Sequence, residues 1–342
     1  MCDALPPDDA GGSGGGGIKT SLLRFDSLTS LPAQDDAADV LVRVTHSTLN
    51  YKDGIVLSGR PGVATQFPLV PGIDFCGEVL ESSTERVRVG DRVVLTGHYM
   101  GQHVSGGLAE VCRVNSDWLV PLEHTGLSQW ESMAVGTAGF TAMQAVDALE
   151  RAGLSPTNPT PVLVTGAGGG VGSFTVSILA RRGYNVVACT GRVEQLREYL
   201  VSLGASKVVD RLTPSDRPLM PEEFAAAVDT VGSSLASILP RMTYGGLVAS
   251  CGNAGGGVVD ASVNVFPFIL RGVTLIGIDS VQLCSSERLH VWSRFNHHEW
   301  KPDIPRIVSD TIRLEDVPDV VPKLMNGAIT GRVVVEIATP ST

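Results

Sequence analysis

The spacing of apolar residues divides this chain into two regions of different character. Between about residues 41 and 120, short apolar runs are interrupted by Gly, Pro and Asp, a pattern typical of short β-strands. The strands predicted there cover residues 40–44, 75–80, 92–96, 108–114 and 118–121. After Leu127 the apolar residues recur at helical spacing up to Leu149, and prolines follow at Pro156, Pro159 and Pro161. The first region is therefore predicted to be a compact β-rich domain.

From residue 161 onward, apolar strands alternate with helical segments. This alternation is typical of a parallel sheet that helices cover on both faces. The predicted strands cover residues 162–165, 186–190, 207–209, 225–230, 247–251 and 274–278. Six such strands make a doubly wound sheet, for which the expected strand order is 3-2-1-4-5-6. A last β-type run, residues 332–337, is expected to return to the first domain. The fold class predicted for the chain is α/β.

The strand at residues 162–165 runs directly into a glycine-rich turn and then into a helical stretch. The turn reads Ala167-x-Gly169-x-x-Gly172, a variant of the dinucleotide-binding pattern G-x-G-x-x-G with alanine first. Gly169 would let the backbone approach a pyrophosphate at the helix N-terminus, and Gly172 would let the helix lie close to the sheet. A plain tight turn is the alternative. The strand before the turn and the set of six strands favour a dinucleotide site.

The end of the second strand indicates which dinucleotide binds. An NAD site usually places Asp or Glu about 20 residues past the glycines. This chain places Thr190, Gly191 and Arg192 there, and a guanidinium can bind phosphate oxygens in a bidentate way. The alternative is a surface arginine at a strand end. We therefore predict NADPH as the cofactor, with Arg211 as a second positive group after the third strand.

Composition and charge exclude several classes of partner. Acidic residues outnumber basic ones by 36 to 26, and no basic cluster appears that could bind nucleic acid. No apolar run reaches the roughly 18 residues that span a bilayer. The first 17 residues lack the pattern of a secretory or transit peptide, and the six cysteines are scattered. A cytoplasmic protein without a membrane or nucleic-acid partner is expected.

The sequence predicts no metal site. No pair of cysteines has the C-x₂-C spacing of a structural zinc site. The histidines at His46, His98 and His103, and the pair His297 and His298, form no grouping typical of metal ligands. Adjacent histidines point in different directions on a helix or strand, so the pair is interpreted as solvated surface residues.

Several motifs along the chain together resemble those of one family. They are NYKDG at residues 50–54, PLVPGIDFCG at 68–77, GGLAE at 106–110, DWLV at 117–120, VGTAGFTAM at 135–143, SLGAS at 202–206, DTVG at 229–232, PFILRG at 267–272 and GIDS at 277–280. With the glycine-rich turn, they resemble the zinc-independent, quinone-oxidoreductase-like branch of the medium-chain dehydrogenase/reductase superfamily, and within it the acryloyl-CoA reductase group. Zinc alcohol dehydrogenases carry Gly-His-Glu where this chain has Gly72, Ile73 and Asp74.

The resemblance implies a fold, a cofactor and a set of contacts. It implies a GroES-like catalytic domain at residues 1–135, completed by about residues 300–342, a Rossmann NADP-binding domain at 136–299, and a homodimer. Tyr51 would lie against the cofactor near the nicotinamide. The other cofactor contacts implied are Gly168, Gly169, Val171, Gly172, Ser173, Thr190, Gly191, Arg192, Arg211, Asn253, Ile269, Ser280 and Arg332.

The resemblance also implies a reaction, the reduction of acryloyl-CoA to propionyl-CoA by hydride transfer from NADPH without a metal. Tyr51 is the candidate catalytic residue, and its alternative role is to shape the nicotinamide pocket. Asn50 and Lys52 could polarise the thioester carbonyl or be structural, and Asp53 and Asp74 are expected to be turn or hydrogen-bonding residues.

Other functions remain open. The loop at residues 97–105 lacks the tryptophan usual in the family, and if it lines the acyl pocket the substrate preference has shifted. A quinone or enone oxidoreductase is one alternative. A non-catalytic NADPH-binding protein is the other.

Overall fold

The structure is a computed structural model that describes residues 2–4, 18–22, 37–64, 66–255 and 263–337. The chain divides into two compact units. The first unit comprises residues 1–137, 281–289 and 308–342, and the second comprises residues 138–280 and 290–307.

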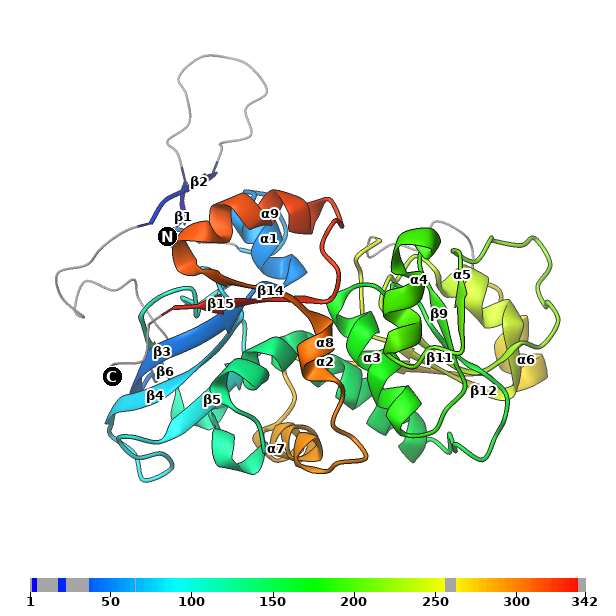
Figure 1. The fold of residues 1–342 in the computed structure, drawn as a ribbon, viewed down its shortest axis with the longest axis horizontal. Helices are drawn as coiled ribbons and strands as arrows, with labels where there is room; N and C mark the ends of the chain where they lie inside the picture. The colour runs from blue at the N-terminus through cyan, green and yellow to red at the C-terminus, as the bar shows by residue number, and fades with distance from the viewer. Residues whose placement is uncertain (1, 5–17, 23–36, 65, 256–262, 338–342) are drawn as a thin grey trace, which may run out of the picture. The chain divides into compact units, whose positions relative to one another are not determined.

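The first unit is built on a mixed sheet. Its strands are β3 (Val40–Thr48), β4 (Asp74–Ser82), β5 (Arg92–Thr96), β6 (Val111–Val114), β7 (Val120–Pro121), β14 (Val308–Arg313) and β15 (Arg332–Glu336). The sheet order is β14-β15-β3-β4-β5-β7, and β6 also pairs with β3. Strand β15, red in Figure 1, pairs antiparallel with the blue strand β3. The helices are α1 (Tyr51–Leu57) and α9 (Val317–Met325), and a small antiparallel pair joins β1 (Cys2–Ala4) to β2 (Ile18–Thr20).

Burial along β3 explains why this region reads as strands. Val40, Val42 and Val44 are fully buried and belong to one hydrophobic cluster with Phe75 and Leu95 from the neighbouring strands. Leu41 between them is buried as well, so the start of β3 is covered on both faces, and a continuous apolar run is the pattern expected of such a strand. Strand β3 extends past the predicted residue 44 to Thr48, since β4 and β15 continue to pair with it there.

The second unit is a six-stranded parallel sheet with helices. Its strands are β8 (Val162–Val164), β9 (Val186–Cys189), β10 (Lys207–Val209), β11 (Phe224–Asp229), β12 (Met242–Ser250) and β13 (Thr274–Gly277). Its helices are α3 (Gly170–Arg181), α4 (Val193–Ser202), α5 (Leu235–Ile238), α6 (Phe266–Arg271) and α8 (Ile304–Ile307). The order β10-β9-β8-β11-β12-β13 confirms the predicted doubly wound order 3-2-1-4-5-6. The predicted α/β class, a β-rich unit beside a doubly wound parallel sheet, is confirmed as well.

Helix α2 (Gln129–Arg151) contains a break that its apolar spacing does not predict. Gly136 has φ 47° and ψ −158°, so two helical segments meet there at a kink. A Cβ atom at this position would lie 2.6 Å from Asp74 Oδ2. Glycine therefore satisfies both the positive φ and the close approach of a buried carboxylate.

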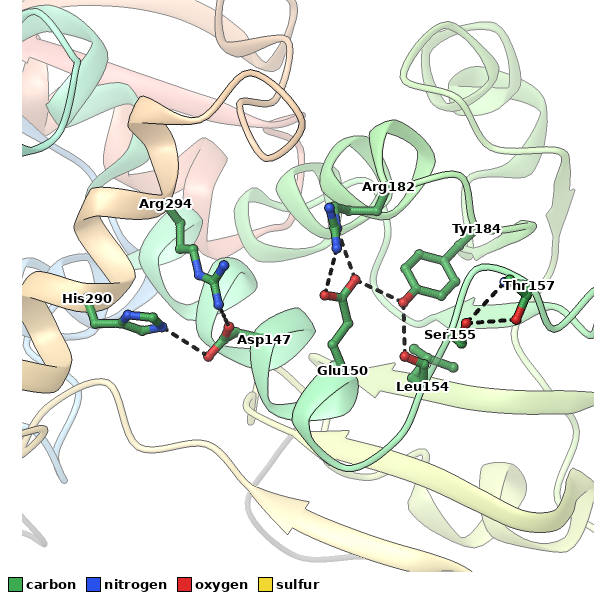
Figure 2. A network of polar contacts seen from close by, with 9 residues as sticks. All are labelled: Asp147, Glu150, Leu154, Ser155, Thr157, Arg182, Tyr184, His290 and Arg294. Atoms are coloured by element: carbon green, nitrogen blue, oxygen red, sulfur yellow. Dashed lines mark hydrogen bonds and ion pairs between the residues drawn. The ribbon is translucent and has the colours of Figure 1, made fainter.

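The later half of α2 is fixed within the second unit by ion pairs. Figure 2 shows Glu150 accepting from the Arg182 guanidinium at 3.0 and 2.9 Å and from the Tyr184 hydroxyl at 2.9 Å. One turn earlier, the buried Asp147 accepts from Arg294 at 2.5 Å. Helix α7 (Ser285–Ser293) adds a histidine whose Nε2 lies 3.7 Å from the Asp147 carboxylate. Paired charges at this depth are costly to separate, so the network fixes the helix in place.

Candidate functional site

The glycine-rich turn connects β8 to α3 in the second unit. Gly166 has φ 55°, and a Cβ atom there would overlap Thr230 Oγ1. A Cβ atom on Gly172 would overlap the Gly166 carbonyl oxygen, so α3 approaches the turn as closely as a glycine allows. Gly169 is exposed, and the nearest atom to a Cβ there is 3.4 Å away. The turn therefore has the tight inner packing and the open outer backbone that a bound diphosphate requires.

The predicted contacts around the turn are not all equally open. Gly168 is buried and Val171 is half-buried. Ser173 is fully buried, its hydroxyl donates to the Ala167 carbonyl at 3.1 Å, and its N–H donates to the Gly169 carbonyl at 2.9 Å. Ser173 thus supports the turn from behind, and its role as a diphosphate contact stays a prediction.

Two arginine side chains lie near the end of β9, Arg192 in the segment Thr190-Gly191-Arg192 and Arg211 after the next strand. A Cβ atom on Gly191 would lie 2.6 Å from Arg211 Nε, so the Arg211 guanidinium lies directly against this glycine. A Cβ atom on Gly168 would lie 3.6 Å from one terminal nitrogen of Arg192. The Arg192 guanidinium therefore lies between the glycine-rich turn and the end of β9. Two guanidiniums at the end of the second strand favour a 2′-phosphate over a bare ribose.

The other predicted contacts in the second unit lie on later strands and helices. Asn253 is exposed just after β12, and Ser280 is half-buried just after β13. Ile269 is 67% exposed on α6, among other exposed apolar residues. Strand β12 pairs with β11, and β11 pairs with β8, the strand that leads into the glycine-rich turn. The carboxyl end of β12 therefore lies at the same edge of the sheet as the turn, whereas α6, which carries Ile269, packs against β12. The structure thus brings Asn253 to the same edge of the sheet as the turn.

In the first unit, the predicted residues Tyr51 and Arg332 meet a buried polar cluster. Tyr51 begins α1 with 36% of its surface exposed. The preceding Asn50 is 8% exposed, and its side-chain amide donates to Asp74 Oδ2 at 2.9 Å. The Asn50 N–H donates to Asp53 Oδ2 at 2.8 Å. The cluster therefore fixes the first turn of the helix that presents Tyr51.

Arg332 is the cation of this cluster. Its guanidinium is buried and donates to the Ala134 and Leu49 carbonyls, to Asn50 Oδ1 at 3.1 Å and to Thr48 Oγ1 at 2.7 Å. These contacts belong to the first unit, and the predicted contact of Arg332 with the cofactor stays a prediction. Both sides of the Asn50 amide are also used, which favours the structural role for Asn50 over polarisation of a substrate carbonyl.

The two buried carboxyls of the cluster have raised pKa values. Burial, reinforced by the nearby charge of Asp74, raises the pKa of Asp53 to about 7. Burial also raises the pKa of Asp74, although hydrogen bonds from Thr137, at 2.7 Å from its N–H and 2.5 Å from its hydroxyl, and the charge of Arg332 oppose this. The sequence predicts turn or hydrogen-bonding roles for both aspartates but does not indicate that they share one site. The available signal was the polar residue at the start of the apolar strand GIDF.

The loop at residues 97–105 follows β5 in the first unit. His98 and Tyr99 both have positive φ angles, 51° and 58°. The His98 ring stacks on Trp118 at 5.2 Å, and burial together with the charge of Arg288 lowers the pKa of His98 to about 4. A run of left-handed residues costs about 1–3 kcal/mol for each and persists only where the surroundings fix it. That the loop lines the acyl pocket stays a prediction.

Within the described residues, no group of three or more His, Cys, Asp or Glu side chains is placed to hold a metal ion. At the position where zinc alcohol dehydrogenases have histidine, Ile73 is buried and offers no ligand atom.

Comparison with known proteins identifies both parts of the chain. The alcohol dehydrogenase GroES-like domain matches residues 36–124, and the zinc-binding dehydrogenase family matches residues 170–295. Acrylyl-CoA reductase AcuI of Ruegeria pomeroyi is 46% identical over 91% of this chain and 92% of its own length. Putative quinone oxidoreductase YhfP of Bacillus subtilis is 45% identical over 87% of this chain and 90% of its own length.

Solved structures agree with these relatives. The yhdH oxidoreductase from Salmonella enterica in complex with NADP has a TM-score of 0.89 and 41% identity, covering 99% of this chain and 100% of its own. The Bacillus subtilis yhfP structure with NAD bound has a TM-score of 0.84 and 43% identity, covering 94% of this chain and 95% of its own. The similarity therefore spans both units.

Proposed function

This chain belongs to the zinc-independent, quinone-oxidoreductase-like branch of the medium-chain dehydrogenase/reductase superfamily, and on that premise we propose that it reduces acryloyl-CoA to propionyl-CoA with NADPH. It is an NADPH-dependent oxidoreductase that acts on CH–CH bonds. The 46% identity to an acrylyl-CoA reductase over 91% of the chain supports the substrate. The single structural observation that carries the choice of cofactor is the placement of two guanidiniums beside the turn, that of Arg211 against Gly191 and that of Arg192 near Gly168.

The residues present fit NADPH in chemistry and in shape. The glycine-rich turn leaves no room for Cβ atoms on its inner side at Gly166 and Gly172, while Gly169 is open to a ligand. Gly168, Gly169 and Val171 would hold the diphosphate through the backbone at the start of α3. Thr190, Gly191, Arg192 and Arg211 would hold the 2′-phosphate. When bound, NADPH supplies the hydride that the β-carbon of the unsaturated thioester accepts.

The chain itself must orient the substrate, stabilise the negative charge that forms on the thioester oxygen, and allow a proton to reach the α-carbon. Hydride addition at the β-carbon moves negative charge onto the thioester oxygen, and the α-carbon then takes a proton. Tyr51 is the catalytic residue we propose, because its hydroxyl is a donor at the surface of the first unit. Asn50, Asp53 and Asp74 act behind it as positioning residues, since their hydrogen bonds fix the start of α1.

The proposed domain limits follow the family. The catalytic domain comprises residues 1–135 and about 300–342, and the NADP-binding domain residues 136–299. The remaining cofactor contacts that we propose are Ser173, Asn253, Ile269, Ser280 and Arg332. Of these, Asn253 has the best structural support, because it is exposed at the carboxyl edge of the parallel sheet.

A homodimer is part of the proposal. In the part of the chain that the structure describes, β13 is an end strand of the parallel sheet. Leu275 on this strand is 43% exposed, and the neighbouring α6 region exposes Val265, Ile269 and Leu270 by 61%, 67% and 56%. An end strand beside exposed apolar side chains favours pairing with a second copy. Light scattering of the protein and of Leu270→Lys tests this: we expect a dimer that the lysine weakens, and a wild-type monomer would refute it.

We also propose a cytoplasmic location. No helix in the described segments is long and apolar enough to cross a membrane. Five cysteines described by the structure are free thiols, which fits a reducing compartment. Fractionation of cells that express the protein tests this proposal.

A quinone or enone reductase is the second candidate, and the 45% identity to a putative quinone oxidoreductase favours it. Kinetics separate the two. Loss of the reduced-nicotinamide absorbance is followed with acryloyl-CoA and with simple quinones at equal concentrations. We expect a higher kcat/KM for acryloyl-CoA. Turnover of quinones alone would leave the cofactor assignment intact and replace the substrate.

A further inference from the structure

The motif Asp229-Thr230-Val231-Gly232 begins at the last residue of strand β11 and continues into the loop that follows it. The proposed function gives this motif no role. Strands β8, β9 and β10 extend to one side of the sheet, and β11, β12 and β13 extend to the other. The order therefore reverses between β8 and β11, which pair directly. In open α/β sheets, ligands bind outside the carboxyl ends of the strands at this reversal. The motif therefore lies at the edge of the sheet where the cofactor site is proposed.

The Asp229 carboxylate spans this reversal. It is fully buried, and its Oδ1 accepts from the Thr165 hydroxyl at 2.6 Å. Thr165 directly follows β8 and begins the glycine-rich turn. The same carboxylate accepts from the N–H groups of Val231 and Gly232 at 3.1 and 3.2 Å and from the Ser234 hydroxyl at 2.6 Å. A buried carboxylate is tolerated only with such a full set of donors.

Thr230 strengthens the same link. Its N–H donates to Thr165 Oγ1 at 3.1 Å, and its hydroxyl donates to the Thr165 carbonyl at 2.9 Å. Three hydrogen bonds thus join the first residue of the turn to two residues of the motif. The next residue of the turn, Gly166, lies against Thr230 Oγ1 without room for a Cβ atom. The three hydrogen bonds of Thr165 and the close packing of Gly166 together fix the start of the turn.

The motif also fixes the loop on its other side. The Cys251 N–H donates to the Asp229 carbonyl at 3.0 Å, and the Gly255 N–H donates to the Val231 carbonyl at 3.0 Å. These two bonds hold both ends of the segment that carries Asn253. One short motif therefore sets the positions of two loops that flank the reversal.

We propose that Asp229 is a positioning residue for the cofactor site, and that through Thr165 it pre-organises the glycine-rich turn to bind the diphosphate. The inference rests on the proposed function. Asp229 does not touch the cofactor; it fixes the backbone N–H groups that do. A site whose donors are already in place loses less conformational freedom on binding. Because the diphosphate is common to NADPH and NADH, both cofactors depend on this residue equally.

The test compares ligands that contain different parts of the cofactor. Thr165→Val removes the hydroxyl that bridges to Asp229 and keeps the volume of the side chain. We expect the Kd of NADPH and that of NADH to rise together by about tenfold, the effect of one charge-assisted hydrogen bond. The inhibition constant of adenosine 2′-monophosphate, which has no diphosphate, should stay within about twofold of the wild-type value. Thr165→Ser keeps the hydroxyl and should restore binding of both dinucleotides.

The control is Thr125→Val in the first unit. Thr125 is also a buried threonine, and its hydroxyl donates to the Leu122 carbonyl at 2.7 Å, outside the glycine-rich turn. The substitution should lower stability without changing the Kd of either dinucleotide. Asp229→Asn is the second variant, and it should also weaken both dinucleotides equally. The proposal is overturned if either variant binds NADPH and NADH as the wild type does, or if NADPH alone is weakened. Failure of the wild type to bind NADPH would instead refute the proposed function.

Discussion

The contact between Gly191 and Arg211 allows the proposed 2′-phosphate site to be tested by a substitution that moves the Arg211 guanidinium without replacing the arginine. In Gly191→Ala the new Cβ atom would lie 2.6 Å from Arg211 Nε and 3.0 Å from one of its terminal nitrogens. Carbon and nitrogen atoms without a hydrogen bond do not approach so closely, so the guanidinium has to move. The substitution therefore displaces one of the proposed phosphate ligands, Arg211, without removing any charge from the protein.

The expected size follows from the bond that is lost. A hydrogen bond to a charged group contributes about 1.5–3 kcal/mol, which corresponds to roughly 10- to 100-fold in Kd. Gly191→Ala should raise the Kd of NADPH by about tenfold, the lower end of that range, because the displaced arginine stays near the phosphate. The Kd of NADH should change by less than about twofold, because NADH lacks the 2′-phosphate.

Fluorescence titration with each dinucleotide measures both constants, and a double-mutant cycle tests the cause. Arg211→Ala alone should weaken NADPH at least as much as Gly191→Ala does. In the double variant the glycine substitution should then add almost nothing, since the group it displaces is gone. Additive effects of the two substitutions, or equal weakening of NADH, would refute the reasoning.

Three further predictions concern the site and its surroundings. Arg192→Glu should reverse the preference to NADH, because a carboxylate at this position repels a 2′-phosphate and can bind the ribose hydroxyls; unchanged preference in paired kcat/KM measurements would show that Arg192 does not contact the phosphate. The pKa of Asp53 is about 7, against 3.8 for a free side chain, so the folded state binds the carboxyl proton more tightly than the unfolded state does. Protonation of Asp53 therefore stabilises the fold fully below about pH 4, and this stabilisation is lost as the pH rises through about 7. Asp53→Asn should flatten urea unfolding free energies over that window, and an identical pH profile would contradict the assignment. Glu150→Gln should lower the free energy of unfolding by about 1–3 kcal/mol, because a neutral amide replaces the carboxylate that accepts from both Arg182 and Tyr184, while the Kd of NADPH stays the same; weaker cofactor binding would show that this network reaches the site.

The sequence predicts the second unit well because each strand there contains a short apolar run that ends at a turn. The order of all six strands follows from this alternation, and the turn after β8 contains the glycines at the expected place. Strand β12 begins at Met242, before the predicted residue 247. The early part contains the 79% exposed Tyr244 and two glycines, and these residues do not form a buried-strand pattern.

The polar cluster of the first unit could not be assembled from the sequence. Arg332 and Thr48 are separated by 284 residues, and nothing in either segment indicates the other. Asp53 precedes Gly54 and Asp74 lies two residues after Gly72, and near glycine an aspartate is more often a turn residue. The kink at Gly136 could not be predicted for the same reason, because it depends on a residue far away in the sequence. The helical spacing continues on both sides of Gly136, and the group that approaches its backbone is the carboxylate of Asp74.

Steady-state kinetics on acryloyl-CoA, with NADPH and NADH side by side, tests the proposed reaction and cofactor together. We expect formation of propionyl-CoA with a kcat/KM for NADPH at least about tenfold above that for NADH, the effect of one phosphate contact. Equal or higher kcat/KM with NADH would contradict the role of the two arginines. No turnover of acryloyl-CoA with either cofactor would contradict the assigned reaction.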